Sequence, residues 1–337
     1  MRLIVILIVV ILHLAALAWI LGSRGRAESE DGGGVGADSA LEKPMDGAEA
    51  GEPAERVAES GGTPPYSDTA FRNAPQALPS GLASDARICR AGIVVDWTDR
   101  VCYWEKHADR SLAIASLTKM MTVLLLMEDL DRHDDLSLQT MVPVTASAAR
   151  VGGRQVWLDP RESFTIDDLL QCILIRSAND CAYLLGEFLA EGNHAAFVAR
   201  MNRRARQLGM DSMTFHNSHG LPVSGSRKEN VGNVRHLAYL AGLLLSHDTV
   251  VKWSSTRLSY IREDTKPFQL VNTNKLITSC PGVNGMKTGY TDESGYCLAA
   301  TCERNGREMV VVALGCPSGK RRDALVASLM EWAYTLH

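Results

Sequence analysis

Three short groups of residues carry side chains that could together perform acyl transfer. The first is Ser116-Leu117-Thr118-Lys119, which stands directly before the apolar run Met120–Leu126. Because residues three apart share one face of a helix, Lys119 can place its amine against the Ser116 hydroxyl. Serine is a weak nucleophile that needs an adjacent base, and a desolvated lysine near other cations can serve once its pKa falls. A helix start also offers backbone amides to a developing oxyanion.

The other two groups supply further hydroxyl, amide and ammonium groups. Ser177-Ala178-Asn179 precedes a predicted helix, and Lys287-Thr288-Gly289 lies on a predicted strand. Lys287 would contribute a positive charge and Thr288 a hydroxyl, while Gly289 would let a ligand approach the backbone closely.

Each group also has a purely structural interpretation. Ser116 can be a helix N-cap beside a solvated lysine, and Ser177 and Asn179 are preferred N-cap residues as well. Lys287 can protect an edge strand against aggregation. All three coincidences in one chain, in this order and local context, are improbable. The sequence therefore predicts a serine acyl-transfer site.

The elements that must position these groups follow from hydrophobic periodicity. Helices are predicted in the middle of the body, at Ser116–Leu130, Thr165–Ile175, Asp180–Leu189, His194–Leu208 and Val234–Leu245. Strands are predicted before and after them, at Arg87–Asp96, Val101–Glu105, Gly285–Thr291, Gly295–Glu303 and Glu308–Gly315. We expect an α+β domain in which both ends form one sheet around an inserted helical lobe, with the chemistry in the cleft between them.

Charge is unevenly distributed along the 337 residues. The 35 basic and 39 acidic side chains give a net charge of −4, but acidic residues concentrate in 28–68 and leave a nearly neutral body. A nucleic-acid partner is not expected, because such proteins show a clustered basic excess. The 46% content of hydrophobic residues excludes wholesale disorder.

The sequence of residues 1–84 predicts an export signal or membrane anchor followed by a linker. Leu3–Leu21 is apolar apart from His13, so residues 1–22 form a signal peptide or an N-terminal membrane anchor. Ala16-Leu17-Ala18 resembles a cleavage site, whereas the length of the segment and Trp19 favour an anchor. Residues 23–84, rich in Gly, Ala, Pro and acid, predict a disordered linker, and residues 85–337 the catalytic domain.

Neither a metal nor a cofactor is expected. His216 and His219 form the only close histidine pair, without a partnering cysteine or carboxylate cluster. None of the eight cysteines forms a C-x-x-C pair, and several stand inside apolar runs, so most are expected in the core and no disulfide is assigned.

With these motifs in place, the sequence resembles the low-molecular-mass penicillin-binding proteins, specifically the serine-type D-alanyl-D-alanine carboxypeptidases of the peptidase S11 type. The Ser-x-x-Lys, Ser-x-Asn and Lys-Thr-Gly set is typical of penicillin-recognising enzymes. The likeness covers roughly residues 86–337 and extends to the segments Ala115–Glu128, Ala149–Leu170, Ser177–Ala182 and Gly285–Ala300. It implies a β-lactamase/transpeptidase-like fold with a five-stranded antiparallel sheet.

The resemblance also implies roles for individual residues. Ser116 would attack the carbonyl between two D-alanines to give an acyl-enzyme, with Lys119 as general base. Ser177 and Asn179 would relay protons and hold the substrate amide.

The third motif would bind the end of the substrate. Lys287 and Thr288 would bind the terminal carboxylate, and Gly289 and Tyr290 would complete the substrate-binding strand. The backbone amides of Ser116 and Tyr290 would form the oxyanion hole. A basic residue near the final helix often assists in this family, and the candidates are Lys320, Arg321 and Arg322.

Two departures from the family pattern are visible. Ala178 replaces a glycine common in relatives, and the chain ends within seven residues of Trp332-Ala333-Tyr334, before the carboxy-terminal β-rich domain and anchor of many relatives. Membrane attachment is therefore expected through Leu3–Leu21. The expected partners are peptidoglycan stem peptides and, as covalent inhibitors, β-lactam antibiotics, met outside the cytoplasm in the periplasm or at the cell surface.

Three alternatives accompany this interpretation. A class A β-lactamase would share the fold, but it typically has Ser-Asp-Asn and a later deacylating glutamate, where residues 213–217 here are MTFHN. A D,D-endopeptidase would use the same residues on cross-links. A catalytically silent module that senses the cell wall is disfavoured by the presence of every nucleophile and base residue.

Overall fold

The computed structural model describes residues 65–67 and 70–336. The predicted signal or anchor segment and most of the predicted linker lie outside these residues. Across the described ranges, the longest apolar helices fall short of what is needed to cross a membrane.

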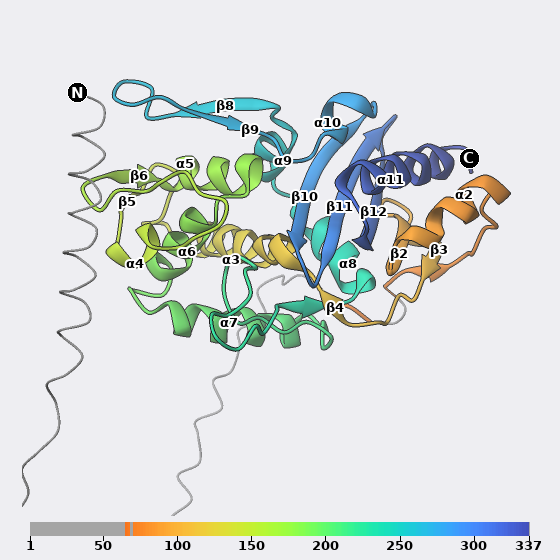
Figure 1. Cartoon of the computed structure of the whole chain (residues 1–337), viewed down its shortest axis with the longest axis horizontal. Helices are drawn as coiled ribbons and strands as arrows, with labels where there is room; N and C mark the ends of the chain where they lie inside the picture. The colour runs from red at the N-terminus through yellow and green to blue at the C-terminus, as the bar shows by residue number, and fades with distance from the viewer. Residues whose placement is uncertain (1–64, 68–69, 337) are drawn as a thin grey trace, which may run out of the picture. The chain divides into compact units, whose positions relative to one another are not determined.

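A six-stranded sheet forms the centre of the domain (Figure 1). Its strand order is β1-β3-β2-β12-β11-β10. The strands are β1 (Arg72–Asn73), β2 (Ala91–Asp96), β3 (Val101–Lys106), β10 (Val283–Thr291), β11 (Gly295–Arg304) and β12 (Arg307–Cys316). Five of them are antiparallel neighbours, as predicted, and the two-residue β1 adds a parallel strand beside β3. The pairing of β12 with β2 joins the two ends of the domain.

Both faces of the sheet are buried. In β2, Ile93 and Val95 belong to the core on the side of α8 (Val234–Leu244), whereas Val94 packs in the cluster with α11 (Gly319–Tyr334). Figure 1 shows these two helices on opposite sides of the sheet. Because β2, β11 and β12 are covered on both faces, their central residues form continuous runs of mainly apolar side chains instead of an alternating pattern.

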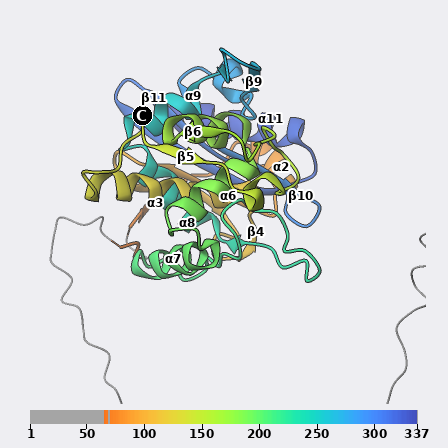
Figure 2. The ribbon, with the colours of Figure 1, turned by 90° about the vertical axis from the view of Figure 1, so that its left-hand side faces the viewer.

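The helical lobe is inserted between β3 and β10. It begins with the 3₁₀ turn η2 (Ala115–Thr118) and contains α3 (Lys119–Arg132), α4 (Ala146–Ala149), α5 (Ile166–Gln171), the π-helical turn η3 (Cys172–Arg176), α6 (Asn179–Phe188), α7 (His194–Gln207), α8 and α9 (Asp248–Ser255). The short α10 (Leu276–Ser279) leads into β10, and α2 (Ser80–Asp85) and η1 (Ala86–Ile88) precede β2. Figure 2 faces the helical side, with α7 below α6 and β9 above.

Three small two-stranded sheets border the lobe. They are β4 (Leu112–Ala113) with β7 (Val231–Gly232), β5 (Met141–Pro143) with β6 (Ser163–Thr165), and β8 (Leu258–Ile261) with β9 (Phe268–Val271). The β8–β9 hairpin, α9 and the 16-residue α11 were not predicted from periodicity.

The predicted helices and strands are confirmed with shifts of a few residues at their ends. The largest difference concerns Thr165–Ile175, which is divided into α5 and the wider turn η3. The predicted start of this helix is confirmed at its N-cap, Thr165, whose hydroxyl forms a reciprocal capping box with the Asp168 carboxylate.

The predicted linker boundary at residue 84 is wrong. Phe71 is buried beside Trp97 and Tyr239, and Tyr66 belongs to the same aromatic cluster. The backbone N–H of Arg72 donates to the carbonyl of residue 100, and α2 follows. Two isolated aromatic residues in a segment rich in proline and alanine give no periodic signal, yet their burial is enough to bind the segment to the domain.

Candidate active site

Ser116 and Lys119 meet where η2 passes into α3. The Lys119 ammonium Nζ lies 3.0 Å from Ser116 Oγ, 2.7 Å from Asn179 Oδ1 and 2.5 Å from the backbone carbonyl of His219. The structure therefore brings the first and second motifs together around one amine. The carbonyl of His219 is a partner that the sequence did not reveal, since its histidines were considered only as metal ligands.

The environment of Lys119 favours its neutral form. Burial, and secondly the positive charge of Arg154, lower the pKa of Lys119 to about 7, while the Asp180 carboxylate acts in the opposite direction. A neutral amine keeps two N–H groups, which match the acceptors on Asn179 and His219. Its lone pair then faces Ser116 Oγ, as a general base requires.

Ser177 has a strained backbone conformation directly after the turn η3. Its φ of +66° is left-handed, which is unfavourable for a residue with a side chain, and it directly follows the π-helical turn η3. Such π-helical turns recur at functional sites because they redirect the chain. Ser177 thereby comes to line the same cavity as Ser116.

The N-cap interpretation of the second motif is wrong. The N-cap residue of α6 is Ala178, and no side chain caps this helix. The Asn179 amide instead donates to the carbonyl of Gly152 at 3.0 Å and accepts from Lys119. It therefore links the nucleophile turn to the loop that follows α4.

The third motif lies on β10, at the edge of the sheet next to the nucleophile turn. A Cβ atom on Gly289 would stand 3.0 Å from the carbonyl oxygen of Ile114 and equally close to the Leu117 side chain. Only glycine therefore allows β10 to lie this close to η2. The Thr288 hydroxyl faces the cleft and bonds Thr273 Oγ1 at 2.8 Å.

Lys287 is buried beneath this surface, so its interpretation as a solvated edge-strand lysine is wrong. Its Nζ donates to the carbonyl of Thr288 at 3.0 Å, and its side chain is almost fully inaccessible. Burial first, and then the charges of Lys119, Arg154 and Arg322, lower the pKa of Lys287 well below its usual range. An anion brought near this amine would favour its charged form.

The loop 217–221 supports the nucleophile turn from behind. Gly220 has a φ of +88°, and a Cβ atom there would stand 2.0 Å from the carbonyl oxygen of Ala115. The Asn217 side-chain oxygen accepts from the backbone N–H groups of His219 and Gly220 at 3.1 and 2.6 Å. This loop thus holds the carbonyl of His219 against Lys119.

A cavity of about 920 Å³ unites the three motifs. Six of the eight predicted site residues line it, namely Ser116, Ser177, Asn179, Thr288, Gly289 and Tyr290. The other two, Lys119 and Lys287, lie buried below its surface. Sequence reasoning missed several lining residues: Arg154, Thr273, Lys275 and Tyr296. Of these, Arg154 and Tyr296 lie in the segments 149–170 and 285–300 that resemble the family, and this resemblance was the available signal.

The cavity wall is cationic. Arg154, Lys275, Lys320 and Arg322 line it, against the single carboxylate of Asp323. Of the three basic candidates near the last helix, Lys320 and Arg322 reach the cavity and Arg321 does not. The Arg322 guanidinium is largely buried, pairs with Asp323 at 2.6 Å and donates to the carbonyl of Cys297 at 3.2 Å. A cleft of this sign attracts an anionic substrate.

The sulfur and histidine side chains offer no alternative chemistry here. All eight cysteines are buried and unbonded to one another. Burial lowers the pKa of His219 to about 3, so its ring is neutral. Within residues 65–67 and 70–336, no group of three histidine, cysteine or acidic side chains is placed to hold a metal ion.

This fold and this set of side chains define a penicillin-recognising serine enzyme, and comparison with known proteins gives the family. The model of the D-alanyl-D-alanine carboxypeptidase family, peptidase S11, matches residues 82–318. The chain therefore belongs to this family of serine carboxypeptidases, whose members act on peptidoglycan outside the cytoplasm.

Individual relatives agree with this placement. The chain is 35% identical over 271 residues to the D-alanyl-D-alanine carboxypeptidase DacF of Bacillus subtilis, which covers 80% of this chain and 67% of DacF. It is 29% identical over 258 residues to a D-alanyl-D-alanine endopeptidase of Haemophilus influenzae, covering 74% of this chain and 83% of that protein. The fold matches penicillin-binding protein D2 of Listeria monocytogenes, solved with cefotaxime bound, with a TM-score of 0.65, 30% identity and coverage of 73% and 97%.

Proposed function

We propose that the chain removes the terminal D-alanine from peptidoglycan stem peptides through an acyl-enzyme on Ser116. The observation that carries this proposal is the fully buried Lys119, held between Ser116 Oγ and the acceptors on Asn179 and His219. A lysine in this environment is available as a base near neutral pH, because burial lowers its pKa to about 7.

In the acylation step, neutral Lys119 takes the proton of Ser116 Oγ as this oxygen attacks the carbonyl between the two D-alanines. The backbone amides of Ser116 and Tyr290 are the proposed oxyanion donors, one at the start of a helix and one on the outer edge of β10. The proton then passes by way of Ser177 to the nitrogen of the leaving D-alanine, and the carbon–nitrogen bond breaks. In the second step water attacks the ester carbonyl and gives a proton to Lys119. The bond to Ser116 Oγ then breaks, Lys119 returns the proton to Oγ, and the shortened peptide leaves with a new carboxyl group.

A free carboxylate at the substrate terminus fits the wall of the cleft that β10 and the start of α11 form. Thr288 and Arg322 line this wall, and Lys287 lies directly beneath Thr288. The arriving carboxylate would raise the lowered pKa of Lys287 and pair with its charged form, so the two groups would bind as an ion pair. A pentapeptide that ends in D-alanine supplies such a carboxylate.

The cavity also separates the proposal from a class A β-lactamase. Its lining holds one carboxylate, Asp323, and this group is paired with Arg322. A carboxylate free to activate the deacylating water is thus absent from the described lining. We expect β-lactams to acylate Ser116 and to leave slowly.

The experiment compares three substrates on the purified chain: a stem pentapeptide, a cross-linked dimer and a β-lactam. We expect D-alanine release from the pentapeptide to be fastest, with Ser116→Ala inactive and unlabelled by fluorescent penicillin. Faster cleavage of the dimer would assign the chain as an endopeptidase, the activity named for the Haemophilus relative. Equal labelling of wild type and Ser116→Ala would refute the mechanism.

We further propose that residues 3–21 deliver the domain to the outer face of the cytoplasmic membrane, with the acidic linker as spacer. Membrane fractionation of the full chain, with and without residues 1–22, tests this. Recovery of the domain in the cytoplasm from the full chain would contradict it.

A further inference from the structure

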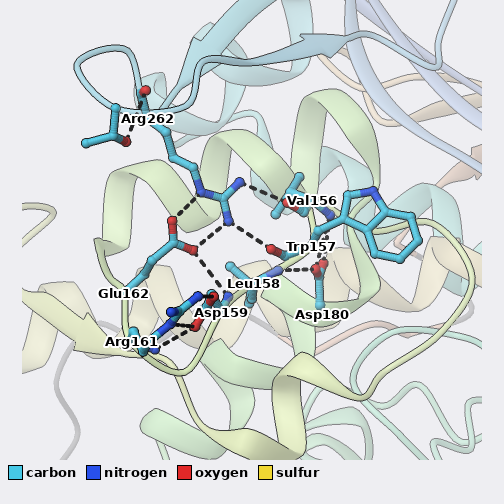
Figure 3. Close-up of polar contacts among 9 residues, drawn as sticks. Val156, Trp157, Leu158, Asp159, Arg161, Glu162, Asp180 and Arg262 are labelled. Carbon is cyan, nitrogen blue, oxygen red and sulfur yellow. Dashed lines mark hydrogen bonds and ion pairs between the residues drawn. The ribbon is translucent and has the colours of Figure 1, made fainter.

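A second cavity lies beside the catalytic cleft, on the other side of one loop. Arg154 of this loop lines the cleft, whereas Val156, Trp157 and Glu162 line a separate hollow of about 640 Å³ together with Arg262 of the β8–β9 hairpin (Figure 3). Trp157 is 67% exposed, the largest exposed fraction among the large hydrophobic side chains of the described residues. Exposed tryptophan beside a hollow is a frequent mark of a binding surface.

The loop holds this indole in a fixed position. The Arg262 guanidinium donates to the carbonyls of Val156 and Trp157 at 2.9 and 3.0 Å. From the other side, the buried Asp180 carboxylate accepts from the backbone N–H groups of Val156 and Leu158 at 3.1 and 3.3 Å. Figure 3 shows these contacts on either side of the loop and the indole directed away from them.

The backbone of Trp157 has a φ of +61°, which is strained for a bulky side chain. Strain of this kind persists only where surrounding contacts impose it, and here the clamp of Arg262 and Asp180 does so. The arrangement stabilises an outward-facing indole that hydrophobic burial alone would disfavour. Such preorganisation is typical of a ligand contact.

The floor of the hollow selects the chemical class of that ligand. Arg262 pairs with Glu162 through two contacts of 2.7 and 2.8 Å, and Arg161 pairs with Asp159 at 2.5 Å. Arg262 is largely buried in its pair with Glu162, whereas Arg161 is exposed at the rim together with Lys266, which adds one further cation to the lining. Within each of the two pairs the charges compensate one another, so the cavity offers many hydrogen-bonding atoms and a small net charge of +1. An uncharged ring with several hydroxyl groups fits this floor better than an ion does.

We propose that this cavity binds an N-acetylhexosamine ring of the glycan strand that carries the stem peptide. The C–H face of the sugar packs on the indole, and its hydroxyl and amide groups bond the polar floor. The proposal rests on the proposed function, because it adds a second contact to the same substrate.

The lengths of the two chains agree with this placement. From Arg154 in the cleft wall to Trp157, the loop spans at most about 11 Å, and the four stem residues between the scissile bond and the sugar span about 14 Å when extended. A stem that leaves Ser116 along the Arg154 wall of the cleft therefore carries its sugar toward Trp157.

The test compares kcat/KM for D-alanine release from a free stem pentapeptide and from the same peptide attached to its disaccharide. We expect the disaccharide substrate to be preferred about tenfold, the effect of one stacked ring. Trp157→Ala should abolish this preference and leave the free pentapeptide within about twofold of wild type. Trp157→Phe should keep part of the preference. Met141→Ala, which removes an exposed side chain on β5, is the matched control and should leave kcat/KM unchanged for both substrates.

Three results would overturn the inference while the proposed function stands. They are equal kcat/KM for the two substrates in wild type, an undiminished preference in Trp157→Ala, and an equal loss on both substrates in that variant, which indicates a structural role. Loss of binding to phospholipid vesicles in Trp157→Ala, with the sugar preference intact, would assign the indole to a membrane instead. Failure of the wild type to cleave either peptide would refute the proposed function itself.

Discussion

The catalytic cleft and the cavity beside Trp157 differ in how their buried basic side chains are neutralised. In the cleft, Lys119 and Lys287 are fully buried without a carboxylate bonded to either, and burial lowers the pKa of both. In the neighbouring cavity, Arg262 is also largely buried, but Glu162 neutralises it through two hydrogen bonds. A buried amine without a carboxylate partner loses its proton easily, so it can act as a base or respond to a substrate anion, whereas a compensated charge fixes the backbone.

The largest effect on the cleft is expected from a substitution of the base, Lys119. Lys119→Met keeps the approximate volume of the side chain and removes the amine, so Ser116 has no group to accept its proton. We expect acylation by labelled penicillin to slow by about 10³- to 10⁴-fold, measured by stopped-time gel fluorescence. A wild-type circular dichroism spectrum is the control for folding, and acylation within tenfold of wild type would contradict the role.

Removing the second buried amine should affect substrate binding more than the chemical step. We expect Lys287→Met to lower kcat/KM for the pentapeptide by about 10²-fold, since a charged contact to the terminal carboxylate is lost. A pentapeptide with an amidated terminus provides the control, because it lacks that carboxylate. If the variant discriminates between acid and amide as strongly as wild type, Lys287 does not sense the carboxylate.

Two neighbouring arginines on α11 allow a matched pair of substitutions, for which we expect a smaller effect on substrate binding. Arg322 lines the cleft, whereas Arg321 does not. We expect Arg322→Gln to raise KM for the pentapeptide about tenfold and Arg321→Gln to leave it unchanged. The steady-state KM of both variants checks this, and equal effects would show that only the general positive charge of the helix matters.

Removal of the Arg262–Glu162 ion pair should lower the stability of the fold and hardly change the rate of D-alanine release from free pentapeptide. Arg262→Gln removes the contacts to Glu162 and weakens those to the loop carbonyls, at about 1.5–3 kcal/mol. We expect the melting temperature to fall by about 4–8 °C, while D-alanine release from free pentapeptide stays within about twofold. Calorimetry and the same assay test both statements, and a large loss of activity at unchanged stability would reverse the assignment.

The pH dependence of this pair has a defined sign. Hydrogen bonds from Arg262 hold the pKa of Glu162 below its usual range, so the contribution to stability is present at neutral pH and is lost as the pH falls through the carboxyl range. The difference in melting temperature between wild type and Arg262→Gln should therefore shrink in acid.

The sequence predicts the site more completely than it predicts the surroundings of the site. Ser116, Lys119 and Asn179 were found because their motifs are local, and the strands β2, β11 and β12 because their central residues form mainly apolar runs. The carbonyl of His219 could not be found, since a backbone group bound across 100 residues leaves no mark on side-chain types.

The same limitation explains the errors outside the cleft. Tyr66 and Phe71 are single aromatic residues in a polar segment, and only tertiary packing shows that they belong to the core. The clamp of Arg262 and Asp180 on the Trp157 loop joins three separate segments of the chain. Hydrophobic periodicity reports local structure, whereas these contacts depend on how distant elements meet.

Burial among cations makes Lys119 a neutral base near physiological pH. The direct test of this role is the rate at which a β-lactam acylates Ser116, measured from pH 5 to pH 10. Because the folded-state pKa is about 7, the base is protonated and inactive below this value. We expect a rate that rises about tenfold per pH unit up to a midpoint near pH 7 and is constant above it. A rate that continues to rise toward pH 10, or one that does not change between pH 5 and pH 8, would contradict this role.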